Sequence, residues 1–81
     1  MDDGGQGALL ISRVVLRAHQ LKSIGPGQRY LLEREWLTDG RVLQRINEGT
    51  PSNDQEWKPI GRWRDIAAER RAVAAQGWEI D

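Results

Sequence analysis

The chain has 81 residues, of which twelve are basic and twelve acidic, so its formal net charge is zero. It has no cysteine, which excludes disulfides and zinc sites built from cysteine. A neutral chain is not typical of a general nucleic-acid coat or of a polybasic membrane anchor. Four tryptophans remain as a means of building the core of so small a domain, because each aromatic ring buries roughly 150–250 Å².

The N-terminal residues 1–7 are rich in glycine and contain no apolar side chain beyond the first methionine. We expect them to form a disordered tail, followed by a single small domain at residues 8–81. The acidic start is unlike a secretory signal peptide, and the longest apolar run, residues 8–11, is too short to cross a bilayer. We therefore expect a cytoplasmic protein that makes no contact with membranes.

The segment at residues 10–22 fits both a helix and a strand. Its apolar residues share one helical face, and the Gly-Pro pair that follows would end such a helix. Its β-branched residues favour a strand. A third strand would also support the hairpin that follows, because two strands alone are marginally stable in water. We predict a strand here, with an N-terminal helix at residues 10–22 as the alternative.

Residues 29–47 are typical of a β-hairpin, with Thr-Asp-Gly at 38–40 as the turn. A two-residue turn and a three-residue turn with Gly40 in a left-handed conformation give different registers. The three-residue turn places Glu33 opposite Arg45, an attractive pair, and collects the larger apolar side chains on one face. We predict this register. The residues on that face are Tyr30, Leu32, Trp36, Val42 and Ile46.

The last part of the chain predicts an edge strand, a helix and a short final strand. The proline within residues 57–60 cannot donate to a sheet, so this piece is an edge strand or none. Asp65 is a good N-cap for a helix at residues 66–76, and Gly77 suits the left-handed residue that ends it. Residues 78–80 alternate in polarity, as a strand does.

Together these elements predict a small α+β fold. Its antiparallel sheet has three to four strands, and the single C-terminal helix packs on one face of the sheet. The alanines of that helix give a flat surface that can lie close to the strands. The expected core consists of Val14, Leu16, Tyr30, Leu32, Trp36, Val42, Ile46, Ile66, Val73 and Trp78.

No set of residues in the sequence has the pattern of a catalytic or metal site. A nucleophilic triad needs a base, and His19 is the only histidine. Glu33 and Glu35 share a strand face, but the neighbouring arginines would keep both ionised, unlike an acid–base pair. The glycines at residues 25–27 lack the lysine and the spacing of a phosphate-binding loop. We expect no enzymatic activity, no cofactor and no metal.

Basic and aromatic residues gather between positions 57 and 71. Rings interleaved with cations can stack on bases and hold phosphates. Acidic residues lie among them, however, and the tryptophans are also needed for the core, so a solvated surface of mixed charge is the simpler interpretation. The candidate binding residues in this segment are Trp57, Arg62, Trp63, Arg64 and Arg71.

These observations predict a non-catalytic interaction module of a bacterial cell, which binds a protein partner or forms a homodimer. The support is the lack of a catalytic set, together with Leu31, Leu37 and Leu43 on the sheet face opposite the expected core. Tryptophan and arginine are also common at binding hot spots. The alternative is a nucleic-acid-binding protein that uses the Trp/Arg-rich surface at residues 57–71.

Overall fold

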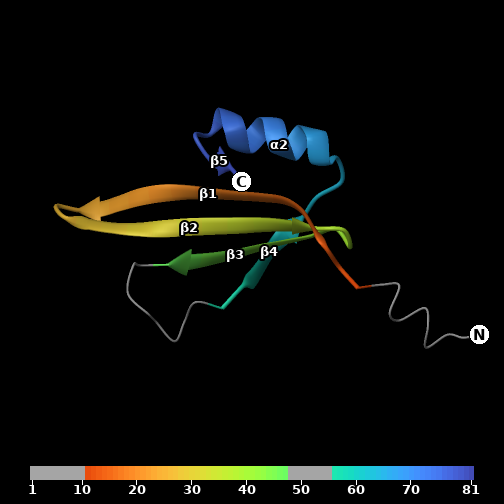
Figure 1. The fold of residues 1–81 in the computed structure, drawn as a ribbon, viewed down its shortest axis with the longest axis horizontal. Coiled ribbons are helices and arrows are strands. Elements are labelled where there is room, and N and C mark those ends of the chain that lie inside the picture. Colours follow the sequence, from red (N-terminus) through yellow and green to blue (C-terminus); the bar gives the residue numbers. More distant parts are fainter. Residues whose placement is uncertain (1–10, 48–55) are drawn as a thin grey trace, which may run out of the picture.

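A computed structural model describes residues 11–47 and 56–81 of the chain, and the predicted tail at residues 1–7 lies outside them. The elements are β1 (Val14–Gly25), β2 (Gln28–Leu37), β3 (Arg41–Asn47), β4 (Lys58–Arg62), α2 (Ile66–Ala75) and β5 (Glu79–Ile80). The strands form one antiparallel sheet in the order β4-β3-β2-β1-β5, and α2 lies over β1 and β5 (Figure 1). The predicted α+β arrangement is confirmed, with five strands instead of three to four.

The first described element is a strand, so the alternative of a helix at residues 10–22 is wrong. β1 pairs with β2 along nearly its whole length, with Arg17 opposite Glu35 and Leu21 opposite Leu31. The register shifts once near each end of β1. Pairing with a long neighbouring strand outweighs the helical spacing of the apolar residues, because strand preference is set mainly by packing against neighbours.

The β2–β3 hairpin has the predicted three-residue turn. Trp36 lies opposite Val42 and Glu33 opposite Arg45, as expected. Gly40 has a positive φ of 92°, and its N–H donates to the carbonyl of Leu37 at 2.9 Å. A glycine adopts this conformation without a steric penalty, so the Thr-Asp-Gly sequence fixes the register.

Helix α2 has both predicted caps. The carboxylate of Asp65 accepts hydrogen bonds from two main-chain N–H groups of the first turn, those of Ala67 at 3.0 Å and Ala68 at 3.2 Å. At the other end Gly77 has a φ of 85°, and the N–H of Trp78 donates to the carbonyl of Val73 at 3.0 Å. This is a Schellman ending, and it directs the chain from the helix into β5.

The core lies between α2 and the strands β1 and β2, and extends to the first part of β3. Its central side chain is Trp36, which is 1 % exposed. The buried cluster consists of Leu16, Ala18, Trp36, Val42, Val73 and Trp78. Leu32, Trp63, Ile66 and Ile80 are partly buried against it. One helix and two buried indoles thus provide most of the core, as the tryptophan content suggested.

Two residues predicted for the core are exposed. Val14 is 40 % exposed, because it lies at the start of β1, beside a shift in register. Ile46 is 45 % exposed, because α2 lies over β1 and β5 and leaves the far part of β3 uncovered. Five strands at about 4.8 Å spacing are wider than a helix of about 10 Å, so one helix cannot cover the whole face.

Candidate interaction surface

The sheet face opposite α2, here called the open face, is covered by no element among the described residues. Alternation along the strands and the strand register assign the side chains to it. The open face comprises Arg17, His19, Leu21, Leu31, Glu33, Glu35, Leu43 and Arg45, with Trp57 leading into β4. It therefore draws residues from across the sheet.

Ion pairs between neighbouring strands order the middle of the open face. Arg17 binds Glu35 through two nitrogens, with Nη2 at 2.6 Å and Nε at 2.9 Å from Oε2. Arg45 Nε lies 2.7 Å from Glu33 Oε1, and the Arg45 guanidinium lies 4.6 Å from the centre of the Trp57 ring. The cations on these central strands are thus already paired with carboxylates or with an aromatic ring.

Glu35 is the most enclosed charged residue among the described residues, with 9 % of its surface exposed. A carboxylate so far removed from water needs a charged partner, and Arg17 supplies one. A related pair lies at the β5 edge, where His19 Nδ1 is 2.6 Å from Asp81 Oδ1. The carboxylates of Glu33 and Glu35 therefore serve as cross-strand ion-pair partners, and Asp81 is a hydrogen-bond partner of the His19 ring.

The leucines predicted to lie on the open face differ from one another in exposure. Leu31 and Leu43 are half-buried, and Leu21 on β1 is 55 % exposed. Leu37 is only 6 % exposed, so it does not project from the face as predicted. Leu37 lies at the β2–β3 turn. There the Trp63 side chain donates a hydrogen bond to the Leu37 carbonyl, and Arg13 and Thr38 are hydrogen-bonded to each other, so Trp63 and Arg13 both lie beside the turn.

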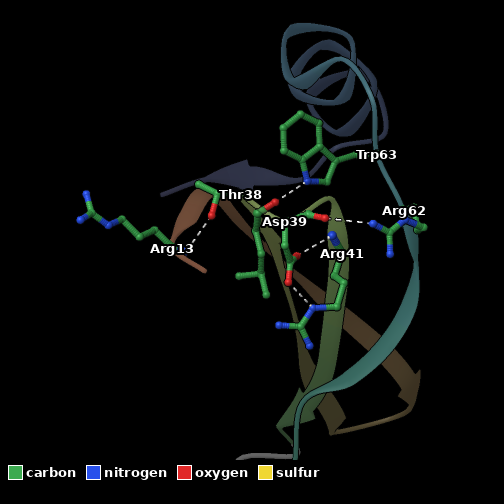
Figure 2. A network of polar contacts seen from close by, with 7 residues as sticks. Arg13, Thr38, Asp39, Arg41, Arg62 and Trp63 are labelled. Atoms are coloured by element: carbon green, nitrogen blue, oxygen red, sulfur yellow. Dashed lines mark hydrogen bonds and ion pairs between the residues drawn. The ribbon is translucent and has the colours of Figure 1, made fainter. Parts of the chain in front are cut away.

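Two of the candidate binding residues hold the β2–β3 turn (Figure 2). Trp63 donates from Nε1 to the carbonyl of Leu37 at 2.7 Å, and its main-chain N–H donates to the carbonyl of Gly40 at 3.0 Å. Arg62 Nη2 donates to the carbonyl of Asp39 at 2.9 Å. In Figure 2 the indole of Trp63 points at the turn, so its polar group has a structural partner.

The other three candidates lie elsewhere. Trp57 precedes β4, roughly 20 Å along the chain from Trp63, and stacks on Arg45. Arg64 lies just before α2 and Arg71 lies within it, both exposed. The five residues thus lie at both ends of β4, between β4 and α2, and on α2 itself, and the structure does not bring them together on one surface.

The side chains in the described part of the chain form no cluster suited to holding a metal ion. No three His, Cys, Asp or Glu side chains come together there.

A shallow hollow of about 150 Å³ beside the start of β4 is lined by Gln44, Arg45, Ile46, Glu56, Lys58 and Ile60. Within the described part of the chain, no helix is long and apolar enough to span a membrane.

Sequence reasoning missed a polar cluster on the helix side of the sheet. The guanidinium of Arg34 lies 4.4 Å from the centre of the Trp78 ring, and Nη2 donates to Gln44 Oε1 at 2.6 Å. Burial lowers the pKa of Arg34, while the nearby Glu69 raises it. Trp36 Nε1 donates to the same Glu69 at 2.9 Å. The sequence feature that could have indicated this cluster is the position of Arg34, midway between two core residues on the same face of its strand.

Asp39 at the β2–β3 turn has a pKa lowered to about 2, first because the Ser12 side chain donates to it and then because the Arg41 N–H does. We predict that Ser12→Ala will raise the pKa of Asp39 toward its usual 3.8. Since the folded pKa is lowered, the ionised carboxylate stabilises the fold above pH ~4, and this contribution is lost as the pH falls toward 2. Titration of the Asp39 carboxyl carbon by NMR measures the pKa.

The control for this titration is Ser23→Ala, which removes a hydroxyl far along β1 that donates to the Gly25 carbonyl instead. It should leave the pKa of Asp39 unchanged. An unchanged pKa in the Ser12→Ala variant as well would show that the serine hydroxyl does not hold the carboxylate.

Comparison of the chain with protein-family models, with curated proteins and with solved structures gave no significant match. The candidate surface is therefore defined by its geometry alone. Its main features are the ordered ion pairs of the open face, the leucines around them and the absence of any covering element among residues 11–47 and 56–81.

Proposed function

We propose that the chain is a non-catalytic, cytoplasmic interaction module that binds a protein, either a partner or a second copy of itself, through the open face. The observation that carries this proposal is a sheet face whose charges are paired across strands and flanked by accessible leucine. Covering paired charges costs a partner less desolvation than covering isolated ones. Arginine and tryptophan on the same face are residue types that often provide binding energy.

The size of the open face indicates how strong this binding can be. Five strands spaced about 4.8 Å apart and averaging about seven residues, each rising about 3.3 Å, span roughly 550 Å². Two such surfaces together bury about 1,100 Å², near the lower limit for a specific interface. We therefore expect weak association, with a dissociation constant in the micromolar range.

A nucleic acid is a poorer fit to the open face than a protein. Binding to phosphates requires cations that are free to replace counterions. Arg17 and Arg45 are already bound to carboxylates. The alternative based on residues 57–71 stays a prediction of the sequence, and titration with single- and double-stranded oligonucleotides at low and moderate salt tests it directly.

Sedimentation equilibrium between about 5 and 500 µM tests the proposal in its homodimeric form, a range set by the expected affinity. We expect wild-type protein to associate, and Leu43→Lys on the open face to abolish association, because an added cation disrupts the paired charges. Lysine keeps an apolar stem against its neighbours, which limits the loss of stability. The matched control, Ala72→Lys on the exposed side of α2, should associate like wild type.

A wild-type protein that remains monomeric throughout the range would exclude the second copy as the occupant of the open face. Association that is abolished by Ala72→Lys and kept by Leu43→Lys would place the contact on the helix side and contradict the proposal. Urea unfolding of both variants shows whether each is folded at the concentrations used.

A further inference from the structure

The two edges of the sheet differ in how well they are protected against the addition of another strand. β4 forms one edge and contains Pro59, which has no N–H to offer, together with Lys58 and a shift in its register against β3. Proline, lysine and bulges are the features by which natural sheets block pairing at an edge. The β4 edge is therefore a poor site for strand addition.

The other edge is only partly covered. β5 has two residues and pairs with β1 only at Ala18 and His19, whereas β1 continues to Gly25. Figure 1 shows the β1–β2 hairpin projecting past α2 and β5. The outer edge of β1 beyond His19 therefore has no neighbouring strand among the described residues.

Alternation along β1 identifies the main-chain groups at this free edge. The carbonyl of Arg17 accepts from the N–H of Asp81, so the main-chain groups of Arg17 face β5. In a regular strand every second residue faces the same way, and the register of β1 is regular from Leu16 to Ser23. The N–H and C=O groups of Leu21 and Ser23 therefore point outward, and no backbone partner for them lies within the described residues.

We propose that the free edge of β1 at residues 21–23 binds an extended acidic segment of another protein, which adds to the sheet as a strand in line with β5. Outward main-chain donors and acceptors are matched by the backbone of an extended chain. Leu21, with 55 % of its surface exposed, provides an apolar contact for alternate side chains of that segment. This inference rests on the proposed function in that both make the chain a protein-binding module, but it concerns the main-chain edge of β1, where Leu21 also borders the open face.

Charge indicates that the added segment is acidic. Residues 20–32 contain two cations, Lys22 and Arg29, and no acidic residue. Neither cation forms an ion pair within the described part of the chain. Lys22 is the residue between the two outward-facing ones, so it lies beside the added strand. A glutamate or aspartate at the opposite position would pair with it.

The same lysine argues against a second copy of the chain as the occupant. Antiparallel self-pairing that uses both outward residues sets Leu21 opposite the second copy's Ser23. That register places Lys22 directly opposite Lys22 of the second copy, and like charges at opposite positions are destabilising. Moving the register to avoid this either meets β5 or relies on the irregular residues near Gly25.

The test uses an octapeptide of alternating glutamate and valine, blocked at both ends, and the full chain labelled with ¹⁵N. We expect the peptide to slow amide hydrogen exchange at Leu21 and Ser23 by about tenfold or more, because these N–H groups become hydrogen-bonded. Two control peptides should give no protection: the alternating lysine–valine octapeptide, and the glutamate–valine octapeptide methylated on alternate backbone nitrogens.

Ser23→Pro gives the matching test on the protein. It removes an outward N–H that β2 does not use, so the β1–β2 pairing is kept while the edge is blocked. We expect peptide affinity to fall about tenfold, and Ser23→Ala to bind like wild type. If Ser23→Pro fails to fold, the wild-type protein still tests the inference. Protection of the Ser23 N–H by the glutamate–valine peptide, together with its absence with the methylated peptide, supports strand addition.

Three results would overturn this inference. One is the absence of protection at Leu21 and Ser23 with every peptide. The second is equal binding of the acidic and basic peptides. The third is unchanged affinity in a folded Ser23→Pro variant. Each of these leaves the open face unaffected, because Leu43→Lys tests that surface in sedimentation. Conversely, loss of the open-face interaction would leave the amide protection at β1 intact.

Discussion

Replacing Trp36 by alanine should lower the free energy of unfolding by about 3–5 kcal/mol, the range for removing a large aromatic side chain from a packed core. Trp36 is almost completely enclosed at the centre of the buried cluster. Its Nε1 also donates to Glu69 of α2 at 2.9 Å, so the same side chain links β2 to the helix. A domain of 81 residues has a total stability of about 4–12 kcal/mol, so this variant should be largely unfolded or close to it.

Urea unfolding followed by circular dichroism measures this loss of stability. Trp36→Phe separates the contribution of the buried ring from that of the hydrogen bond to Glu69. Phenylalanine keeps most of the buried ring but cannot donate to Glu69, which leaves a partly buried carboxylate without that bond. We expect a loss of about 1–3 kcal/mol for Trp36→Phe, intermediate between wild type and Trp36→Ala. A loss below about 1 kcal/mol in Trp36→Ala would show that this indole is not central to the core.

The elements that sequence reasoning predicted well are those whose signals are local. The Thr-Asp-Gly turn fixed the β2–β3 register, because only a glycine adopts the φ of 92° at position 40 without strain. The start of α2 depended on one carboxylate at Asp65, and its end on one left-handed glycine at position 77. Each of these features requires a particular residue at one position, so a single sequence shows it.

The choice between strand and helix for β1 required information from outside the segment. Its apolar spacing suited a helix, and the strand prediction rested on its β-branched residues and on what the hairpin needed for stability. β1 proved to be a strand that pairs with β2 along one side and with the short β5 along part of the other. A two-residue strand such as β5 is supported by this tertiary contact and by the end of the helix before it.

The candidate surface was only partly predictable. Leucines on the second face and the Glu33–Arg45 pair followed from the register. The burial of Leu37 did not, because it depends on β1 and Trp63 meeting at the turn, far apart in sequence. The free edge of β1 could not be predicted from the sequence either, since it depends on how many residues of β5 pair with a strand about 60 positions earlier.

The turn that set the register should also be sensitive to a single methyl group. A Cβ added at Gly40 would lie 3.0 Å from Arg62 Nη2, and the positive φ of this residue disfavours any side chain. We expect Gly40→Ala to lose about 2–3 kcal/mol of stability in urea unfolding. About 1–2 kcal/mol of this comes from the backbone strain and about 1 kcal/mol from displacing Arg62 from the Asp39 carbonyl.

Gly27 provides the matched control, because it also has a positive φ, 72°, but a Cβ added there would meet no atom within 4 Å. Gly27→Ala should therefore lose only the backbone component, about 1–2 kcal/mol. In an Arg62→Ala background the extra loss at Gly40 should disappear, because the group that the methyl displaces is gone. If the extra loss persists there, it arises from the turn backbone, and the Arg62–Asp39 contact is not what makes this glycine necessary.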